Sequence, residues 1–420
     1  MRRGRTRIQG NRNPEWPDRC LGCRGDSPRF LRHQPYLRQS LPSSAPMTAE
    51  QWLTRIFADQ APRRFGSGWV SGVLGIVLGL LSVAAVLCLH FPHWLTLPEL
   101  RGRYPLGLVR TAIDAGIFAT LLLAALSMLL RRRKALGLAG LALAGIALAL
   151  GAGGVAIPEA PASPVYVGLD WFVLGVLTTA AVFVPLERAF ALRRQQGPFR
   201  RGWLTDASYF FMSHALVQLM SLLVLIPATQ VGQALAIAPA QAWVQMAPLV
   251  VQFLAVVLVA DLAQYAVHRA FHAVPLLWRF HRVHHSVTTM DWIAGSRLHL
   301  VDVVATRALV LLPIVTLGFE QVAVYAYLGF VSLHAVFIHA NFAPRSPWLE
   351  RWVAMPRFHH WHHAIEPEAR DTNFAVHLPM IDRWFGTEHM PKDRWPSGYG
   401  VQGLEVPEGY VRQLVWPLRG

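Results

Sequence analysis

Three clusters of histidines in the last third of this chain combine a metal-binding residue type with a spacing that suits one helix face. They are His268-x-x-x-His272, His281-x-x-His284-His285 and His359-x-x-His362-His363. A neutral imidazole nitrogen is the commonest metal ligand in proteins, and residues three or four apart share a face of a helix. Each cluster can therefore direct two or three rings at one point. Eight rings are too many for one ion, so we expect two.

Two more histidines lie in an apolar stretch between the second and third clusters. His339 ends that stretch, and we expect it to be a further ligand. His334 lies five residues earlier, about 140° around an ideal helix, so it joins the ligands only if the helix is locally distorted. Histidines that stand alone, such as His90, have the ordinary role of core or surface residues.

The ligand types favour iron over zinc. A structural zinc takes four ligands, and cysteine is common among them, but the three cysteines of this chain lie far from the clusters. Eight to ten histidines without cysteine suit a redox-active pair of ions with open positions. We therefore expect two iron ions, with no catalytic residue beyond their ligands.

Polar side chains near the clusters are candidates to orient the ligand rings through hydrogen bonds. The candidates are Asp261, His299, Asn341, Asp371 and, with them, Asp302. The alternative role for each aspartate is a helix cap or a partner for arginine. We favour this alternative for Asp382, which precedes Arg383.

The composition indicates a membrane protein that crosses the bilayer several times. Only 15% of the 420 residues are charged and 53% are hydrophobic, which is too apolar for an ordinary soluble domain. The formal net charge is +15. In a membrane protein such an excess of basic residues is typical of cytoplasmic loops, which lie beside acidic lipid head groups. We therefore expect no nucleic-acid partner.

Apolar runs of spanning length predict an all-α fold, because a span needs about 20 residues. The runs are 68–90, 107–130, 135–156, 166–186, 207–229 and 245–267, followed by a hairpin at 303–317 and 320–341. Lysine and arginine concentrate after the even-numbered runs, so these ends are expected in the cytoplasm. The prediction is a polytopic membrane helical bundle with a cytoplasmic, histidine-rich helical metal-binding cap.

The chain divides into four predicted regions. Residues 1–46 are basic, rich in Pro and Ser, and without apolar periodicity, so we expect a disordered tail; Met47 is a candidate for the native start. Residues 47–160 should hold the N-terminal transmembrane helices and 165–390 the catalytic domain. Residues 391–420 should form a C-terminal tail.

The motifs around the histidines resemble the fatty acid hydroxylase/sterol desaturase superfamily over about residues 165–390. They are Asp261-Leu-Ala-Gln-Tyr265-Ala-Val-His268-Arg-Ala-Phe-His272, Leu277-Trp278-Arg-Phe-His281-Arg-Val-His284-His285, Arg297-Leu-His299, His339-Ala-Asn341-Phe342, His359-His-Trp-His362-His363, Asp371-Thr-Asn373-Phe374 and Asp382-Arg-Trp-Phe385-Gly386-Thr387.

The resemblance implies an integral membrane, di-iron, oxygen-dependent oxidoreductase, with all metal ligands from histidines. Such an enzyme hydroxylates or desaturates a C–H bond of a sterol, fatty acyl chain or related lipid. Two features depart from the family's pattern. Leu300-Val301-Asp302 follows His299 where Pro-Leu-Glu is frequent, and His334 and His339 do not have the spacing of an HxxxH motif.

Reducing power is expected from a separate protein, a ferredoxin or a reductase, because no nucleotide-binding loop, heme motif or iron–sulfur motif is visible. The basic loops around Arg193, Arg194, Arg200 and Arg201 could attract an acidic carrier, or could serve only as topology signals.

Two other classes of function remain open from the sequence. A non-catalytic metal-binding or metal-transport protein would need polar residues deep in several spans, whereas these histidines concentrate at one membrane face. A zinc hydrolase of the same fold would need a placed base and a polar pocket open to water.

Overall fold

The computed structural model describes residues 66–97, 105–151, 166–197, 199–215, 221–344 and 346–419. Within these ranges every named element is a helix, and the only β pairings are two isolated bridges. The predicted all-α fold is therefore confirmed. The predicted tail at 1–46 and the candidate start at Met47 lie outside the described residues.

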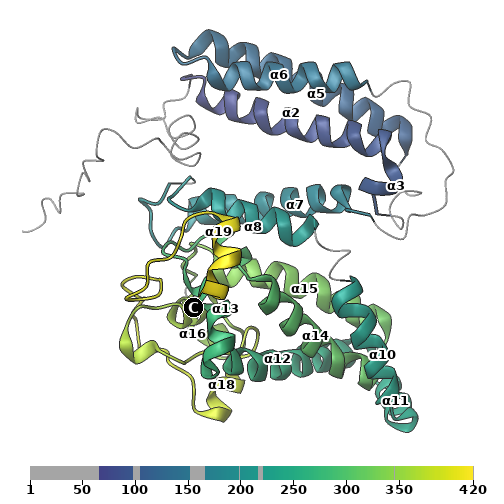
Figure 1. Cartoon of the computed structure of the whole chain (residues 1–420), viewed down its shortest axis with the longest axis vertical. Coiled ribbons are helices and arrows are strands. Elements are labelled where there is room, and N and C mark those ends of the chain that lie inside the picture. The colour runs from purple at the N-terminus through teal and green to yellow at the C-terminus, as the bar shows by residue number, and fades with distance from the viewer. Residues whose placement is uncertain are drawn as a thin grey trace, which may run out of the picture. The chain divides into compact units, whose positions relative to one another are not determined.

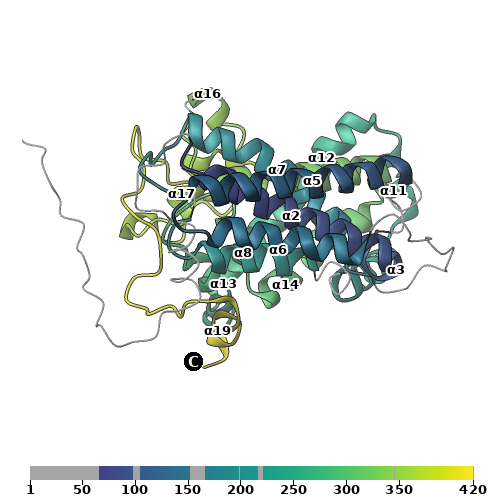
Figure 2. The same ribbon diagram turned by 90° about the horizontal axis from the view of Figure 1, so that it is seen from above.

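Three apolar helices near the N-terminus pack against one another: α2 (Trp69–His90), α5 (Leu106–Leu130) and α6 (Ala135–Leu150) (Figures 1 and 2). Small residues let their backbones approach closely. A Cβ added at Gly137 would lie 2.8 Å from the carbonyl oxygen of Ala124, too close for any side chain. Such contacts are typical of helices that pack within membranes. The short helix α3 (Pro92–Leu95) follows α2.

Six helices in the described part of the chain are long and apolar enough to cross a membrane. They are α2, α5, α7 (Leu169–Ala189), α12 (Leu249–Ala273), α14 (Leu300–Leu317) and α15 (Gln321–His339). These agree with six of the predicted runs. Both helices of the predicted hairpin are present, and each packs against α12. Gly318, with a φ of 67°, ends α14 in a left-handed conformation that glycine adopts without strain.

Two predicted spans differ in the structure. The run at 135–156 contains a helix of only 16 residues, which ends at Leu150. Within the run at 207–229, the described residues belong to α8 (Trp203–Ala215), a π-helical turn (Ser221–Leu225) and α10 (Ile226–Ala234). A bend of 110° then leads into α11 (Ala238–Gln245). Prolines stand in the first turns of α10 and α11, where they favour a helix start.

The helices α12, α14 and α15 form the apolar support of the histidine-rich region (Figure 1). Their shared core includes Val256, Ala260, Val310, Ile314 and Tyr327. The helix α10 packs against α14. Because α12 and α15 carry histidines at their C-terminal ends, this packing fixes where those ends lie.

Short helices around this support carry the remaining clusters. Pro275 starts α13 (Pro275–His285) directly after α12 ends, and α17 (Pro356–His362) holds the third cluster. The other short helices are η2 (Ala294–Ser296), α16 (Pro347–Glu350), η3 (Pro367–Ala369) and α18 (Pro379–Phe385).

The residues predicted as a C-terminal tail include two folded elements, α19 (Tyr410–Val415) and η4 (Trp416–Arg419). The first contacts α8 and the second contacts α13. The guanidinium of Arg282 lies 4.1 Å from the ring centre of Trp416, a cation–π contact. This segment is therefore packed beside the helix that carries the second histidine cluster.

Candidate metal centre

Nine histidines form two groups in which the ring nitrogens lie within 4.8 Å of one another. Group A consists of His268, His272, His281, His285 and His362, and group B of His284, His339, His359 and His363. All are buried except His272, which is half-buried. Nine of the ten predicted ligands are thus brought together, and His334 is not among them.

The two groups divide the sequence clusters between them. On α13, His281 and His285 are one turn apart and face group A, whereas His284 faces group B. At α17 and its C-cap residue His363 the third cluster is divided in the opposite sense, with His362 in group A and the pair His359 and His363 in group B. The groups therefore share two helices and adjoin: the rings of His285 and His363 stack with centroids 4.4 Å apart.

The Nε2 atoms converge within each group. The Nε2 atoms of His268 and His281 are 3.0 Å apart, and those of His359 and His339 are 2.9 Å apart. The Nε2 atoms of His272, His285 and His362 are buried without a hydrogen-bond partner. A buried polar atom left unpaired costs about 1–3 kcal/mol, so such a concentration of bare nitrogens fits two metal cations.

The opposite nitrogen of most rings is held by the protein. Backbone carbonyl oxygens accept hydrogen bonds from the Nδ1 atoms of His268 (Phe374, 2.7 Å), His284 (Arg297, 3.1 Å), His339 (Ala335, 2.7 Å) and His362 (Thr372, 2.8 Å). Because a carbonyl can only accept, these rings carry their proton on Nδ1. Their Nε2 lone pairs are then free to bind a metal ion.

Two carboxylates hold rings of group A. The Nδ1 atom of His281 donates to Asp302 over 2.7 Å, and that of His272 donates to Asp371 over 3.1 Å. The bond from His272 lowers the pKa of Asp371, which is partly exposed. Asp371 adopts a positive φ of 58°, so the chain turns sharply where this carboxylate meets its ring.

Burial keeps the rings neutral. It is the largest cause that lowers the pKa values of His281, His284, His285, His359, His362 and His363 well below 6.5. Neighbouring histidines lower these pKa values further, because two positive rings repel each other. The rings are therefore uncharged near neutral pH, the form that binds metal.

Two further aspartates position a loop and not a ring. Asp261 accepts hydrogen bonds from the backbone N–H groups of residues 376–378 at 2.6–3.1 Å. Asp382 accepts from the N–H groups of Phe374 and Ala375, both at 2.8 Å, and from the Thr387 hydroxyl. Of the two roles expected for Asp382, a helix cap or a partner for arginine, the pairing with arginine is wrong, because Arg383 pairs with Glu388. Both aspartates instead hold the loop whose Phe374 carbonyl orients His268.

The remaining predicted residues lie away from the two groups. His299 caps α14 by accepting from the Val301 N–H, and its Nε2 donates to the Leu414 carbonyl. His334 donates from Nε2 to the Ala354 carbonyl, and its Nδ1 lies 3.1 Å from that of His377. An offset of 140° on α15 turns it away from the side that carries His339.

Asn341 acts on a neighbouring loop. Its side-chain oxygen accepts from the Arg193 N–H, and its amide nitrogen donates to the Arg193 carbonyl. The contact ties the end of α15 to the segment after α7. Asn341 is hydrogen-bonded to none of the nine clustered histidine rings.

Two residues that border group B were not predicted. A Cβ added at Gly295 would lie 2.6 Å from Nδ1 of His339, so only glycine fits against this ring. Two residues further on, the carbonyl of Arg297 holds His284. Neither feature has a local sequence signal, because both depend on where the loop at 291–297 meets rings from other helices.

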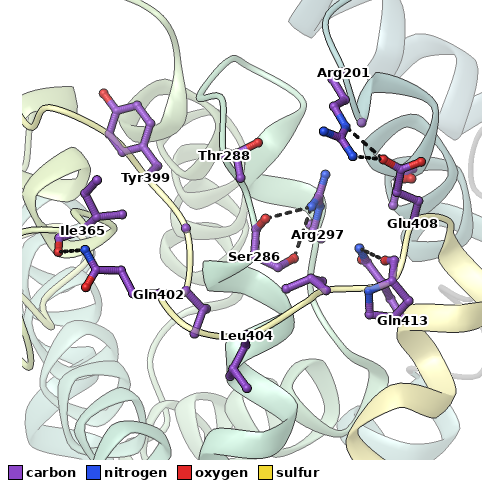
Figure 3. Close-up of a pocket in the computed structure, with 16 residues that line it drawn as sticks. Arg201, Ser286, Thr288, Arg297, Ile365, Tyr399, Gln402, Leu404, Glu408 and Gln413 are labelled. Carbon is purple, nitrogen blue, oxygen red and sulfur yellow. Dashed lines mark hydrogen bonds and ion pairs between the residues drawn. The ribbon is translucent and has the colours of Figure 1, made fainter. Parts of the chain in front are cut away.

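The basic loop proposed for an electron carrier is only partly on the surface. Arg200 is buried and paired with Asp206 and Asp291, whereas Arg201 is exposed and paired with Glu408. Beside them is a polar cavity of about 280 Å³. Ser286, Arg297 and Gln413 line it, together with Arg201 and Glu408 (Figure 3).

Comparison with known proteins matches residues 253–387 to the family model described as "Fatty acid hydroxylase", a range that includes all nine clustered histidines. Ornithine lipid hydroxylase OlsE of Rhizobium tropici is 27% identical over 264 residues, which are 59% of this chain and 76% of that protein. Alkylglycerol monooxygenase of Danio rerio is 27% identical over 177 residues, 38% of this chain and 37% of that protein. Fatty acid hydroxylase vlmA of Lecanicillium sp is 43% identical over 56 residues, 12% of this chain and 15% of that protein. No solved structure matches.

Proposed function

Because this chain belongs to the fatty acid hydroxylase superfamily, we propose that it is a multi-pass membrane enzyme that hydroxylates a lipid with O2 at a pair of iron ions. The observation that carries the proposal is the pair of adjoining groups of neutral histidines with inward Nε2 atoms. Histidine-only sites with room for two ions suit redox chemistry better than a closed structural zinc site.

The residues of this chain have distinct tasks in the proposed reaction. The five rings of group A would hold one iron ion and the four rings of group B the other. Iron, when bound, supplies the one-electron chemistry by which O2 is activated. Asp302 and Asp371 fix two rings of group A, and backbone carbonyls fix four rings across both groups. Burial keeps bulk water away from the ring nitrogens.

Hydroxylation is proposed in preference to desaturation, because the relatives are named as hydroxylases or a monooxygenase. Their named substrates, an ornithine lipid, an alkylglycerol and a fatty acid, share an alkyl chain. The substrate is proposed to be a lipid of this kind, reached from the bilayer in which the six apolar helices would lie. The histidine groups are proposed to lie on the cytoplasmic side.

The overall reaction needs an electron donor. One oxygen atom of O2 enters the C–H bond and the other leaves as water, which consumes two electrons and two protons. We propose that the electrons come from a separate ferredoxin or reductase. Arg201 and its exposed neighbours remain available to such a carrier, but the buried Arg200 does not.

The test is reconstitution of the purified protein in lipid vesicles with iron, a ferredoxin and its reductase, NAD(P)H and isotopically labelled O2. The expected result is a lipid that has gained one labelled oxygen atom. Variants His285→Ala and His363→Ala, one for each group, should abolish this product. His90→Ala should not, because its ring contacts the carbonyls of Leu150 and Gly151.

Bound metal without oxygen consumption or lipid product would contradict the proposed activity. That outcome would favour a non-catalytic metal-binding protein. A product that forms equally well with zinc in place of iron would contradict the assignment of iron.

A further inference from the structure

A network of four buried charges lies next to group B. Asp206 accepts from Arg200 over 2.6 Å through one oxygen and from Arg297 over 2.5 Å through the other. Arg200 also pairs with Asp291 through two hydrogen bonds of 2.6 Å. All four side chains are at most 7% exposed. We call this set the Arg200 network.

The network holds the loop that forms one wall of group B. Asp291 and Arg297 stand near the two ends of this loop, and both are tied through Arg200 and Asp206. Arg297 is anchored a second time, since its Nη1 donates to the Ser286 hydroxyl over 3.1 Å (Figure 3). Between the ends, Gly295 lies against the ring of His339. The position of the loop therefore depends on charges that come from outside it.

The loop reaches group B through two contacts. The Arg297 carbonyl accepts from Nδ1 of His284, and Gly295 limits where the His339 ring can lie. Four rings of group A are held at Nδ1 by other segments: residues 371–374 hold three and Asp302 of α14 holds one. A shift of the loop would disturb the two groups unequally.

We propose that Asp206 and Arg200 are positioning residues that determine the metal occupancy of group B and not that of group A. The inference rests on the proposed function in one respect, that each group holds an ion. Removing the charge of Asp206 would leave two buried guanidiniums with one carboxylate between them. A buried charge that loses its partner is strongly unfavourable, so Arg297 and the loop it anchors would move.

Both positioning residues lie outside the matched range 253–387. Arg200 and Asp206 belong to the segment that leads into α8 and to its first turn. They reach Asp291 and Arg297 across 91 residues of sequence. The segment before the matched domain would therefore complete the metal centre without supplying a ligand.

The experiment compares full-length wild type with Asp206→Asn in detergent, loaded with iron under limiting conditions. Disturbing a residue that orients a metal ligand lowers metal affinity by about 10–100-fold. Iron per chain should fall from about two to about one, and the spectroscopic signature of an exchange-coupled ferric pair should give way to that of a single ferric ion.

Double variants identify which ion is lost, because the effects of two substitutions that act on the same metal site do not add. Adding His363→Ala of group B to Asp206→Asn should cause no further loss of bound iron. Adding His285→Ala of group A should remove the remaining ion. Arg201→Gln is the matched control, since Arg201 adjoins Arg200 but is 82% exposed; it should keep about two ions.

Other outcomes separate the two proposals. Wild type with two ions and Asp206→Asn with two ions would overturn the inference, as would an equal loss from both groups. Wild type that binds no metal would instead refute the proposed function. If Asp206→Asn does not accumulate, Ser286→Ala removes one anchor of Arg297 and should weaken iron binding at group B alone. An unchanged iron affinity, or an equal loss of affinity at both groups, would again overturn the inference.

Discussion

Gly295→Ala is predicted to damage the metal centre through one methyl group. The added Cβ would lie 2.6 Å from Nδ1, 2.9 Å from Cγ and 3.1 Å from Cε1 of His339. The ring cannot simply retreat, because Nδ1 donates to the Ala335 carbonyl over 2.7 Å and Nε2 faces His284 and His359. Gly295 does not have a positive φ, so alanine causes no backbone strain and acts only by contact.

The expected magnitude follows from the overlap. Restoring an ordinary contact requires a movement of about 1 Å, and overpacking of this kind costs about 1–3 kcal/mol. If the ring yields, this energy opposes metal binding at group B and weakens it by about 5- to 150-fold. Turnover should fall with the loss of that ion.

The assay is iron per chain during titration, together with turnover and the thermal unfolding midpoint. The matched control is Gly329→Ala on α15, the helix that carries His339, because an added Cβ there meets nothing within 4 Å. The control should behave as wild type. Normal iron affinity and turnover in Gly295→Ala would refute the placement of this loop against His339.

Four further predictions test the centre and its surroundings. His284→Ala and His362→Ala should each abolish turnover and lower bound iron from about two ions per chain to about one, because each substitution removes a ring from only one of the two groups. Asp302→Asn should leave the protein folded but weaken iron binding about 10–100-fold, measured by metal titration, because His281 loses its carboxylate partner. The metal-free protein should lose stability as pH falls below about 6.5 in thermal melts, because rings with depressed pKa values bind protons only when unfolded; a pH-independent midpoint would contradict their burial as neutral rings. Deleting residues 1–46 should leave insertion and turnover unchanged in the reconstituted assay, since no clustered histidine lies there.

Local spacing was enough to predict which histidines gather at the centre. Residues three and four apart meet on one helix face whatever surrounds the helix, and eight of the nine rings that converge were predicted from that rule. The ninth, His339, was predicted because it ends an apolar run. The same rule argued against His334, which lies beside His377. Six of the eight predicted spans were also predictable from the sequence, because length and apolar composition are local properties.

The assignment of rings to two groups was beyond local reasoning. His284 and His285 are neighbours in sequence but face different groups. The division depends on how α13 and α17 are rotated toward α12 and α15, which no spacing within one helix specifies. Likewise, Asp302 and Asp261 both stand near ligands in sequence, yet only Asp302 reaches a ring.

The sequence by itself determined that this protein is helical, apolar and rich in clustered histidines, because each of these properties belongs to short segments. Only the tertiary structure decided that Arg200 is buried while Arg201 is exposed. Both look alike as basic loop residues. The difference arises because Asp291, far along the chain, is folded back to meet one of them and not the other.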